Sequence, residues 1–376
     1  MSNIVISGTG LYTPPDAVSN EKLVQSYNAH VDQYNALHAD EIEAGNMEAK
    51  QPSTVEFIEK ASGIKNRYLM EGEGPTDVNR MRPGLSKLAD ETAMGTPVQV
   101  KMALEAAKDA LNEAGLTGED IDLVIISSSL WERFVPSMAC ELQQILGAGG
   151  FAFDMAMGCS SATFGMSTAM DTINSGMANK ALVITAEYIS PAMNYVERDS
   201  HFIFGDAAVA MVLEREEETK SQNAFRINSR KLFTQYSTNI RAAFGARTLV
   251  EDHKITDADQ RFQQEGRVVF RELLPMVINL VQGHLAEVGK QVSDFKRFWL
   301  HQANINMNMF ATKKLLNEDP TQDKAPIVLD EYANTAGAGC MIAFHKYKND
   351  FQSGDEGVIC SFGASYSIGC MCVEKV

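Results

Sequence analysis

Short runs of continuous hydrophobic residues recur along the chain and predict buried β-strands. The runs are Asn3–Ser7, Ile121–Ser127, Ala181–Thr185 and Val358–Phe362. A strand without polar alternation is buried on both faces, as in a parallel sheet that helices cover. Residues Val98–Ala114 repeat hydrophobic positions with helical spacing and stop at Gly115, which is typical of an amphipathic helix. Alternating strands and helices predict the α/β class.

The order of these elements repeats in the two halves of the chain. In the first half, Asp154 is followed by a predicted strand that starts at Leu182. In the second half, Asp330 is followed after the same number of residues by a predicted strand that starts at Val358. A helix and a strand come before each aspartate at matching spacing, so we expect a duplicated α/β unit.

The charged run Glu214–Lys220 (EREEETK) is the expected boundary between the halves, which gives domains at residues 1–215 and 216–376. Residues 28–97 do not fit the repeat, because they are polar and rich in loop formers. We interpret them as an insertion of loops and short helices on the surface, with a lid or an interface as the alternative role.

Composition narrows the class of function. Thirty-three Lys and Arg residues against 49 Asp and Glu give a net charge of −16 and a pI near 4.9. Such an acidic surface repels nucleic-acid phosphates and anionic lipid headgroups, so neither nucleic acid nor membrane is an expected partner.

The N-terminal residues Met1–Gly10 show no basic stretch ahead of a hydrophobic one, and no hydrophobic run is long enough to span a bilayer. The six cysteines are too few for a disulfide scaffold and form no zinc-type pattern. We therefore expect a cytoplasmic protein with free thiols and no structural metal.

Cys159 is a candidate nucleophile, because the segment FDMAMGCSSATFG predicts a strand that runs into a helix at this residue. Backbone N–H groups and the helix dipole at such a position lower a thiol pKa. The alternative is a buried cysteine that only fills space, which is the commoner use of this residue.

His301 and Asn334 are candidate partners of that thiol. His301 (WLHQANINM) directly follows a strand, at the sheet edge where α/β proteins bind ligands. Asn334 (YANTAGAG) occupies the place in the second half that Cys159 has in the first, so the duplication predicts that amide and thiol face each other. Alone, Asn334 reads equally well as a turn residue.

The segment Phe362–Gly369 (FGASYSIG) follows the last predicted strand, and its small residues would let a backbone N–H approach a substrate. It is either part of an oxyanion hole or a tight connection between strands.

With Cys159, His301 and Asn334 in this order, the sequence resembles the thiolase-fold condensing enzymes of the β-ketoacyl-acyl-carrier-protein synthase III family. The motifs are GCSSATFG, FGDAAVA, HQAN and ANTAGAG. The segments SGTGLYTPP and FIEKASGIKNR resemble the subgroup that starts from a medium-chain primer, the β-ketodecanoyl synthases. The resemblance implies a thiolase-like fold of two duplicated halves in a layered αβαβα arrangement.

The resemblance also implies the chemistry. Cys159 would take an acyl group from a thioester, which in this subgroup is a medium-chain acyl-CoA, and malonyl-acyl-carrier protein would decarboxylate and attack it. His301 and Asn334 would stabilise the enolate, and the Cys159 N–H with one from Gly363 or Ala364 would form the acylation oxyanion hole. No metal or redox cofactor would be needed.

Further residues follow from the same resemblance. The enzyme would be a homodimer in which Phe134 and Val135 reach the end of the partner's acyl tunnel. Lys313 and Lys314 would dock the acidic carrier protein, although adjacent lysines are ordinarily just a solvated surface.

Three other interpretations remain open. The first is an acetyl-primed synthase or a condensing enzyme of secondary metabolism. A papain-like cysteine peptidase also uses Cys, His and Asn in this order, but its cysteine lies near the mature N-terminus. The last is an inactive partner subunit.

Overall fold

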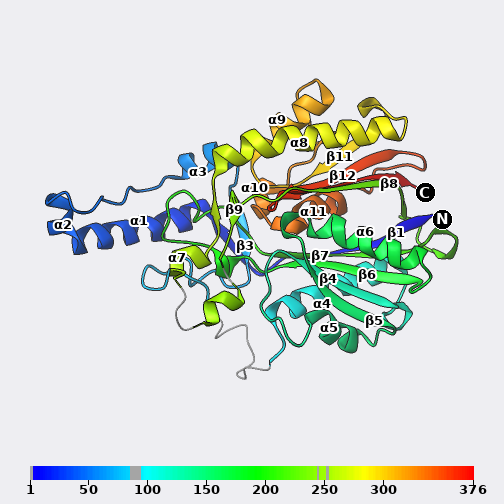
Figure 1. The fold of residues 1–376 in the computed structure, drawn as a ribbon, viewed down its shortest axis with the longest axis horizontal. Helices are drawn as coiled ribbons and strands as arrows, with labels where there is room; N and C mark the ends of the chain where they lie inside the picture. The colour runs from blue at the N-terminus through cyan, green and yellow to red at the C-terminus, as the bar shows by residue number, and fades with distance from the viewer. Residues whose placement is uncertain (1–2, 85–94, 244, 251–253) are drawn as a thin grey trace.

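The computed structural model describes residues 3–84, 95–243, 245–250 and 254–376, and a nine-stranded sheet runs through it (Figure 1). The strand order is β11-β12-β13-β8-β1-β7-β6-β4-β5. The strands are β1 (Ile4–Tyr12), β4 (Leu123–Ser128), β5 (Phe151–Ala156), β6 (Lys180–Glu187), β7 (Ala207–Arg215), β8 (Phe225–Thr234), β11 (Arg297–Leu300), β12 (Glu356–Gly363) and β13 (Ser367–Lys375). All four predicted strands are therefore confirmed.

The sheet consists of two half-sheets that meet between β1 and β8. Only Val5 and Ile6 of β1 pair with β8, opposite Arg226 and Phe225. β4 is parallel to β5 and β6, and β11 is parallel to β12, as expected. β1 differs from the prediction, because it is antiparallel to both β7 and β8. The run of β1 is hydrophobic throughout because helices cover both faces of the strand. Burial on both faces does not show whether a strand is parallel or antiparallel to its neighbours.

Helices form three layers around the half-sheets (Figure 1). Their bounds are α4 (Val98–Ala114) and α5 (Met138–Leu146), then α6 (Ser161–Asn174) and α11 (Gly339–Lys346), then α8 (Gly266–Glu287) and α9 (Ile305–Leu316). Separate hydrophobic cores bind the first pair to β4, β6 and β7 and the last pair to β11, β12 and β13. α6 and α11 share one core with both half-sheets. The layering is thus αβαβα, and the thiolase-like fold is confirmed.

The outer helix α4 lies directly on β1 because the strand carries glycines where the two backbones meet. A Cβ atom at Gly8 would lie 2.1 Å from the Ala110 carbonyl oxygen, and one at Gly10 would lie 2.0 Å from that of Ala106. The helix ends as predicted at Gly115, which has the left-handed φ of 67°. The SGTG segment therefore serves close packing of the first layer.

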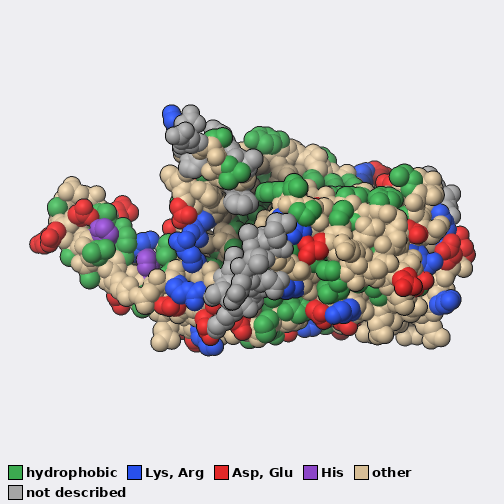
Figure 2. Space-filling model, turned by 90° about the horizontal axis from the view of Figure 1, so that it is seen from below, with side chains coloured by type: hydrophobic (Ala, Val, Ile, Leu, Met, Phe, Trp, Pro, Cys, Tyr) green, Lys and Arg blue, Asp and Glu red, His purple; other side chains and the backbone are tan. Residues whose placement is uncertain are grey.

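The insertion is more regular than expected. α1 (Asn20–Leu37) has 18 residues, so the prediction of only loops and short helices from residue 28 is wrong there. α1 and the short α2 (Ala39–Glu43) project from the body of the molecule in Figures 1 and 2. α3 (Val55–Ser62) and a ribbon of β2 (Asp16–Ser19) with β3 (Asn66–Leu69) return the chain to the body. Residues 85–94 of the insertion lie outside the described residues.

The remaining elements are small. A second ribbon pairs β9 (Ile240–Arg241) with β10 (Gln263–Gln264), and α7 (Asp257–Gln260) and α10 (Leu329–Tyr332) are single turns. The 3-10 turn η4 (Glu216–Glu218) connects β7 to β8 at the expected boundary of residues 1–215 and 216–376, which stays a prediction. The two halves are not identical here, because Asp154 lies in β5 whereas Asp330 lies in the helical turn α10.

Candidate active site

Cys159 lies between β5 and α6, in the 3-10 turn η2 (Gly158–Ser160) that opens the helix. Gly158 has a φ of 53°, which lets the strand turn sharply into the helix. The cysteine is half-buried and lines a cavity of about 360 Å³. The other lining residues are mainly hydrophobic: Ser129, Leu130, Gly158, Ile189, Ala192, Phe204, Ile240, Arg241, Ala242, Phe262, Ala336 and Ala364.

The end of β12 packs against the Cys159 thiol. A Cβ atom at Gly363 would lie 2.5 Å from the Cys159 Cβ and 2.8 Å from its Sγ, so only glycine fits there. The backbone N–H groups of Ala364 and of Cys159 itself lie near the sulfur and act to lower the thiol pKa. Of Gly363 and Ala364, it is Ala364 whose N–H faces the thiol.

The expectation that the thiol pKa is depressed is wrong for this conformation. Burial raises the pKa of Cys159 to about 12, and the nearby Glu187 carboxylate raises it further. The two N–H donors act in the opposite direction but are outweighed. Cys159 is therefore a protonated thiol at neutral pH.

His301 follows β11 and lies beside the end of β12. Its N–H donates to the Cys360 carbonyl at 2.8 Å, and its ring meets the Phe362 ring edge to face at 5.2 Å. The side chain is 2% exposed, and burial lowers its pKa to about 4, so the imidazole is neutral at neutral pH. Nδ1 has no partner among the described residues.

The other polar residues of the HQAN motif hold the backbone around His301. Gln302 Nε2 donates to the Leu300 carbonyl at 2.8 Å, and its Oε1 accepts from the Val328 N–H at 3.0 Å. Asn304 caps α9 by accepting from the Asn306 N–H at 2.8 Å. Only the histidine of the motif is left for chemistry.

Asn334 lies between α10 and the turn η7 (Ala336–Ala338), which opens α11. Its Oδ1 accepts from the Ala336 N–H at 2.9 Å, which turns the amide so that Nδ2 is the group left to donate. Its backbone pairs with the FGD segment at Phe204. Asn334 lines a cavity of about 530 Å³, separated from the Cys159 cavity by the Ile203–Phe204 segment.

Cys159, His301 and Asn334 are connected through a few residues that lie between them. β12 contacts His301 through Phe362 and Cys159 through the adjacent Gly363. Ala336, which orients Asn334, lines the same cavity as Cys159. α6 starts directly after Cys159 and α11 shortly after Asn334, and the two helices share the middle layer. The structure thus places Cys159 and His301 against the end of β12, and Asn334 beside the turn η7, whose Ala336 lines the Cys159 cavity.

The structure does not bring Phe134 or Val135 to the Cys159 cavity of the same chain. Both are exposed, at 62% and 85%, in the loop between β4 and α5. Lys313 and Lys314 lie on the last turn of α9, where Lys313 forms an ion pair with Asp319 at 2.6 Å.

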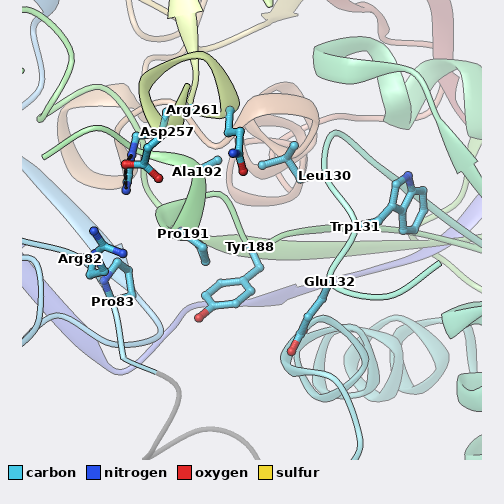
Figure 3. Close-up of a pocket in the computed structure, with 11 residues that line it drawn as sticks. Arg82, Pro83, Leu130, Trp131, Glu132, Tyr188, Pro191, Ala192, Asp257 and Arg261 are labelled. Carbon is cyan, nitrogen blue, oxygen red and sulfur yellow. Dashed lines mark hydrogen bonds and ion pairs between the residues drawn. The ribbon is translucent and has the colours of Figure 1, made fainter. Parts of the chain in front are cut away.

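A second cavity adjoins the first and had no sequence signal of its own. It measures about 420 Å³ and shares Leu130 and Ala192 with the Cys159 cavity (Figure 3). Trp131 and Tyr188 line it further, and Figure 3 shows both rings beside the two shared residues. Together the cavities extend from the thiol along a largely hydrophobic wall.

Sequence reasoning also missed Glu187 and Ser129. Glu187 is the last residue of β6 and is fully buried beside Cys159. An acidic residue at the end of a hydrophobic strand run was a usable signal, because buried carboxylates are rare.

The six cysteines are all free, as predicted. Across the residues that the structure describes, no cluster of three or more His, Cys, Asp and Glu side chains suits a metal ion. None of the helices described combines the length and hydrophobicity that crossing a bilayer requires.

Comparison with known proteins identifies the family of this chain. Residues 153–230 match the family 3-oxoacyl-[acyl-carrier-protein] synthase III, and residues 285–375 match its C-terminal family. The β-ketodecanoyl-[acyl-carrier-protein] synthase of Pseudomonas aeruginosa is 45% identical, over 94% of this chain and 100% of that protein. A β-ketoacyl-[acyl-carrier-protein] synthase III of Clostridium novyi is 27% identical over 100% of this chain and 99% of its own length.

Solved structures show the same relationship. The crystal structure of 3-oxoacyl-[acyl-carrier-protein] synthase III from Aquifex aeolicus superposes with a TM-score of 0.74 at 25% identity, covering 99% of each chain. The thiol at the start of α6, the histidine after β11 and the asparagine before η7 thus occur in a chain that belongs to the β-ketoacyl-[acyl-carrier-protein] synthase III family.

Proposed function

We propose that this chain catalyses the decarboxylating Claisen condensation of an acyl thioester with malonyl-acyl-carrier protein, the step that initiates fatty acid synthesis. The Cys159 sulfur attacks the thioester carbonyl of the primer, the bond from that carbonyl to the primer's sulfur breaks, and the proton that Cys159 loses ends on the departing thiol. Loss of carbon dioxide from the malonyl group then supplies the electron pair for the new carbon–carbon bond, the bond between the acyl group and Cys159 breaks, and a proton taken up from solvent restores the Cys159 thiol. The observation that carries the proposal is Cys159 in a hydrophobic cavity with two N–H groups directed at its sulfur.

His301 and Asn334 are proposed to stabilise the enolate. The neutral His301 ring carries one proton to donate, and Asn334 presents Nδ2 because Ala336 occupies its Oδ1. Two neutral donors suit a charge that exists only in the transition state, since they do not bind the ground state as strongly. The N–H groups of Cys159 and Ala364 serve the acylation half of the reaction in the same way.

We propose a medium-chain acyl-CoA as primer. The relative from Pseudomonas aeruginosa bears the name of the ten-carbon β-ketoacyl product, which corresponds to an eight-carbon primer plus two carbons of malonate. The cavity behind Cys159 continues past Leu130 and Ala192 into the one in Figure 3, and this gives a longer chain hydrophobic surface to contact. Each buried methylene contributes roughly 0.8 kcal/mol.

The proposal also covers cofactors, partners and location. Decarboxylation supplies the electron pair, so the reaction requires no metal or redox cofactor. The working unit is proposed to be a homodimer, because Val135 and Phe134 are exposed on a single chain and free to contact a second copy. Acyl-carrier protein is the partner, and the cytoplasm is the proposed compartment.

A substrate panel tests the function. We expect the protein to release carbon dioxide from malonyl-acyl-carrier protein and to form a product two carbons longer than the primer, and to cleave no peptide. Mass spectrometry after incubation with octanoyl-CoA alone should find the acyl adduct on Cys159, and Cys159→Ala should abolish it. Cys140→Ala is the matched control, because Cys140 is the exposed cysteine on α5. An adduct on any other cysteine contradicts the assignment.

A further inference from the structure

Glu187 is a fully buried carboxylate that the proposed mechanism does not use. The Ser129 N–H donates to its two oxygens at 3.2 and 3.0 Å, and the Ser129 hydroxyl donates to Oε1 at 3.0 Å. The Gly337 N–H donates to Oε1 at 3.0 Å. Within the described residues its partners are all neutral, and a buried charge without a cation is costly to retain.

These contacts connect two sides of the site. Ser129 lies in the loop after β4, and Gly337 lies in η7, the turn that follows Asn334. A Cβ atom at Gly337 would lie 2.7 Å from Glu187 Oε1 and 3.1 Å from the Cβ of Ser161, so η7 is packed tightly against the start of α6. The carboxylate therefore sits where the turn of Asn334 meets the turn of Cys159.

The charge of Glu187 also acts on the thiol. It is the one charged side chain that contributes to the raised pKa of Cys159, after burial. Among the described residues, the titratable groups that face Glu187 are Cys159 and Asp206, which precedes β7. β4 and η7 present N–H and hydroxyl groups instead.

We propose that Glu187 is a positioning residue that fixes the Asn334 turn against the Cys159 turn, and that its carboxylate, held beside the thiol, slows the reaction of Cys159 with alkylating agents. Only the thiolate reacts with such agents, and a neighbouring negative charge disfavours the thiolate. The inference rests on the proposed function in one respect, namely that Cys159 is the nucleophile.

Alkylation of Cys159 by iodoacetamide, followed by mass spectrometry across pH 5 to 10, measures the thiolate directly and needs no substrate. Burial raises the pKa of Glu187 to about 7. Its ionisation near that pH raises the thiol pKa, so the logarithm of the wild-type rate should rise, flatten just above pH 7 and rise again. A single slope without the flat segment would overturn the proposal.

Variants separate charge from structure. Glu187→Gln keeps an acceptor for Ser129 and Gly337 but removes the charge, so alkylation at pH 8 should accelerate by roughly tenfold, as one unit of thiol pKa implies. The flat segment should disappear. Glu187→Asp keeps the charge and should stay slow. Fast alkylation of both variants, or of neither, would show that the charge plays no part.

The surface variant Glu217→Gln removes one negative charge from exposed η4 and should leave the profile unchanged. If Glu217→Gln accelerated alkylation of Cys159 as much as Glu187→Gln does, the acceleration would come from the net charge of the protein, and the proposal would be overturned. Condensation is assayed in parallel. A flat segment without condensation contradicts the proposed function alone, whereas condensation without the flat segment contradicts the role of Glu187 alone.

Discussion

Single side chains in this site owe their protonation states to burial more than to charged partners. Burial lowers the pKa of His301 to about 4 and raises that of Cys159 to about 12. Both groups are consequently neutral at neutral pH. A neutral donor and a protonated thiol suit a reaction in which negative charge appears only transiently on the substrate.

His301→Ala and Asn334→Ala should separate the two halves of the reaction. Each variant should still form the Cys159 acyl adduct, because the N–H groups proposed for acylation are those of Cys159 and Ala364. Condensation should slow by about a hundredfold or more, the cost of one oxyanion donor. Single-turnover kinetics with adduct detection by mass spectrometry measures both steps. Gln302→Ala is unsuitable as a control because it loosens the same backbone. Loss of the adduct in either variant would contradict this division of roles.

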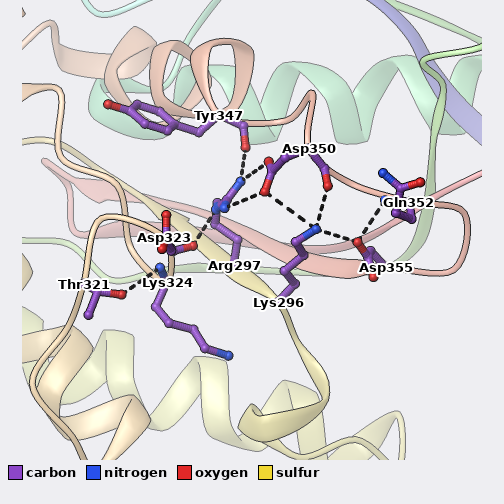
Figure 4. Close-up of polar contacts among 9 residues, drawn as sticks. All are labelled: Lys296, Arg297, Thr321, Asp323, Lys324, Tyr347, Asp350, Gln352 and Asp355. Carbon is purple, nitrogen blue, oxygen red and sulfur yellow. Dashed lines mark hydrogen bonds and ion pairs between the residues drawn. The ribbon is translucent and has the colours of Figure 1, made fainter.

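At the scale of elements, β11 is held by a buried cation at its start (Figure 4). The Arg297 side chain is 5% exposed and forms an ion pair with Asp350 at 2.6 Å. It also donates to the carbonyls of Asp323 and Tyr347, as the dashed lines in Figure 4 show. The neighbouring Lys296 contacts Asp355 at 2.7 Å. The position of His301 at the other end of the strand depends on this anchor.

Arg297→Met should lower the free energy of unfolding by about 3 kcal/mol, because it leaves the Asp323 and Tyr347 carbonyls without the buried guanidinium that now donates to them, whereas the exposed Asp350 carboxylate regains water. Urea denaturation followed by circular dichroism measures the loss. Lys296→Met is the matched control. The Lys296 side chain is 33% exposed, against 5% for Arg297, so its loss should cost less than about 1 kcal/mol. Equal losses would mean that burial of Arg297 adds nothing.

Elements with a strong pattern were predictable from the sequence, and those set by tertiary contacts were not. The strand runs and α4 follow from hydrophobic spacing and Gly115. The sequence pattern did not predict α1, because the buried face of this helix is narrow. Its hydrophobic residues Leu23, Tyr27 and Val31 stand among polar residues. Asp330 was matched to a strand residue on spacing alone, and spacing does not reveal that this segment turns into α10.

For the candidate site, the motif residues Cys159, His301 and Asn334 could be named from the sequence, but the thiol pKa could not. That pKa depends on burial and on Glu187, and neither is visible in local sequence. The choice of Ala364 over Gly363 as N–H donor depends on how β12 ends, which spacing does not fix.

On the scale of the whole molecule, a net charge of −16 opposes binding of an acidic carrier protein. We expect Lys313→Glu with Lys314→Glu to raise the KM for malonyl-acyl-carrier protein several-fold at low salt and to leave that for malonyl-CoA unchanged. The effect should fade at about 1 M salt, where the Debye length is roughly 3 Å. Steady-state kinetics with both donors measures it. An equal loss with malonyl-CoA would indicate a folding defect instead.

A dimer would place exposed Val135 at the tunnel of the other subunit. Octanoyl primer should then exceed acetyl by more than about tenfold in kcat/KM, because burial of two methylenes already exceeds the ~1.4 kcal/mol that a tenfold ratio needs. Val135→Phe should erase much of that preference by filling the space. Competition between the two thioesters measures the ratio. Ile145→Phe, which places a phenyl ring at another exposed hydrophobic position, on α5, should leave it unchanged. A Val135→Phe variant with undiminished preference for octanoyl would contradict the tunnel model.

The middle layer of helices has a further consequence, for how this protein evolves. α6 and α11 start at the residues beside Cys159 and Asn334, and both lie in one core between the half-sheets. A repacking that shifts either helix by a fraction of an ångström moves a reacting group, whereas the same repacking in α4 or α8 does not. Lineages of this family should therefore accept hydrophobic exchanges freely in the outer layers. In the middle layer they should accept only exchanges that conserve volume.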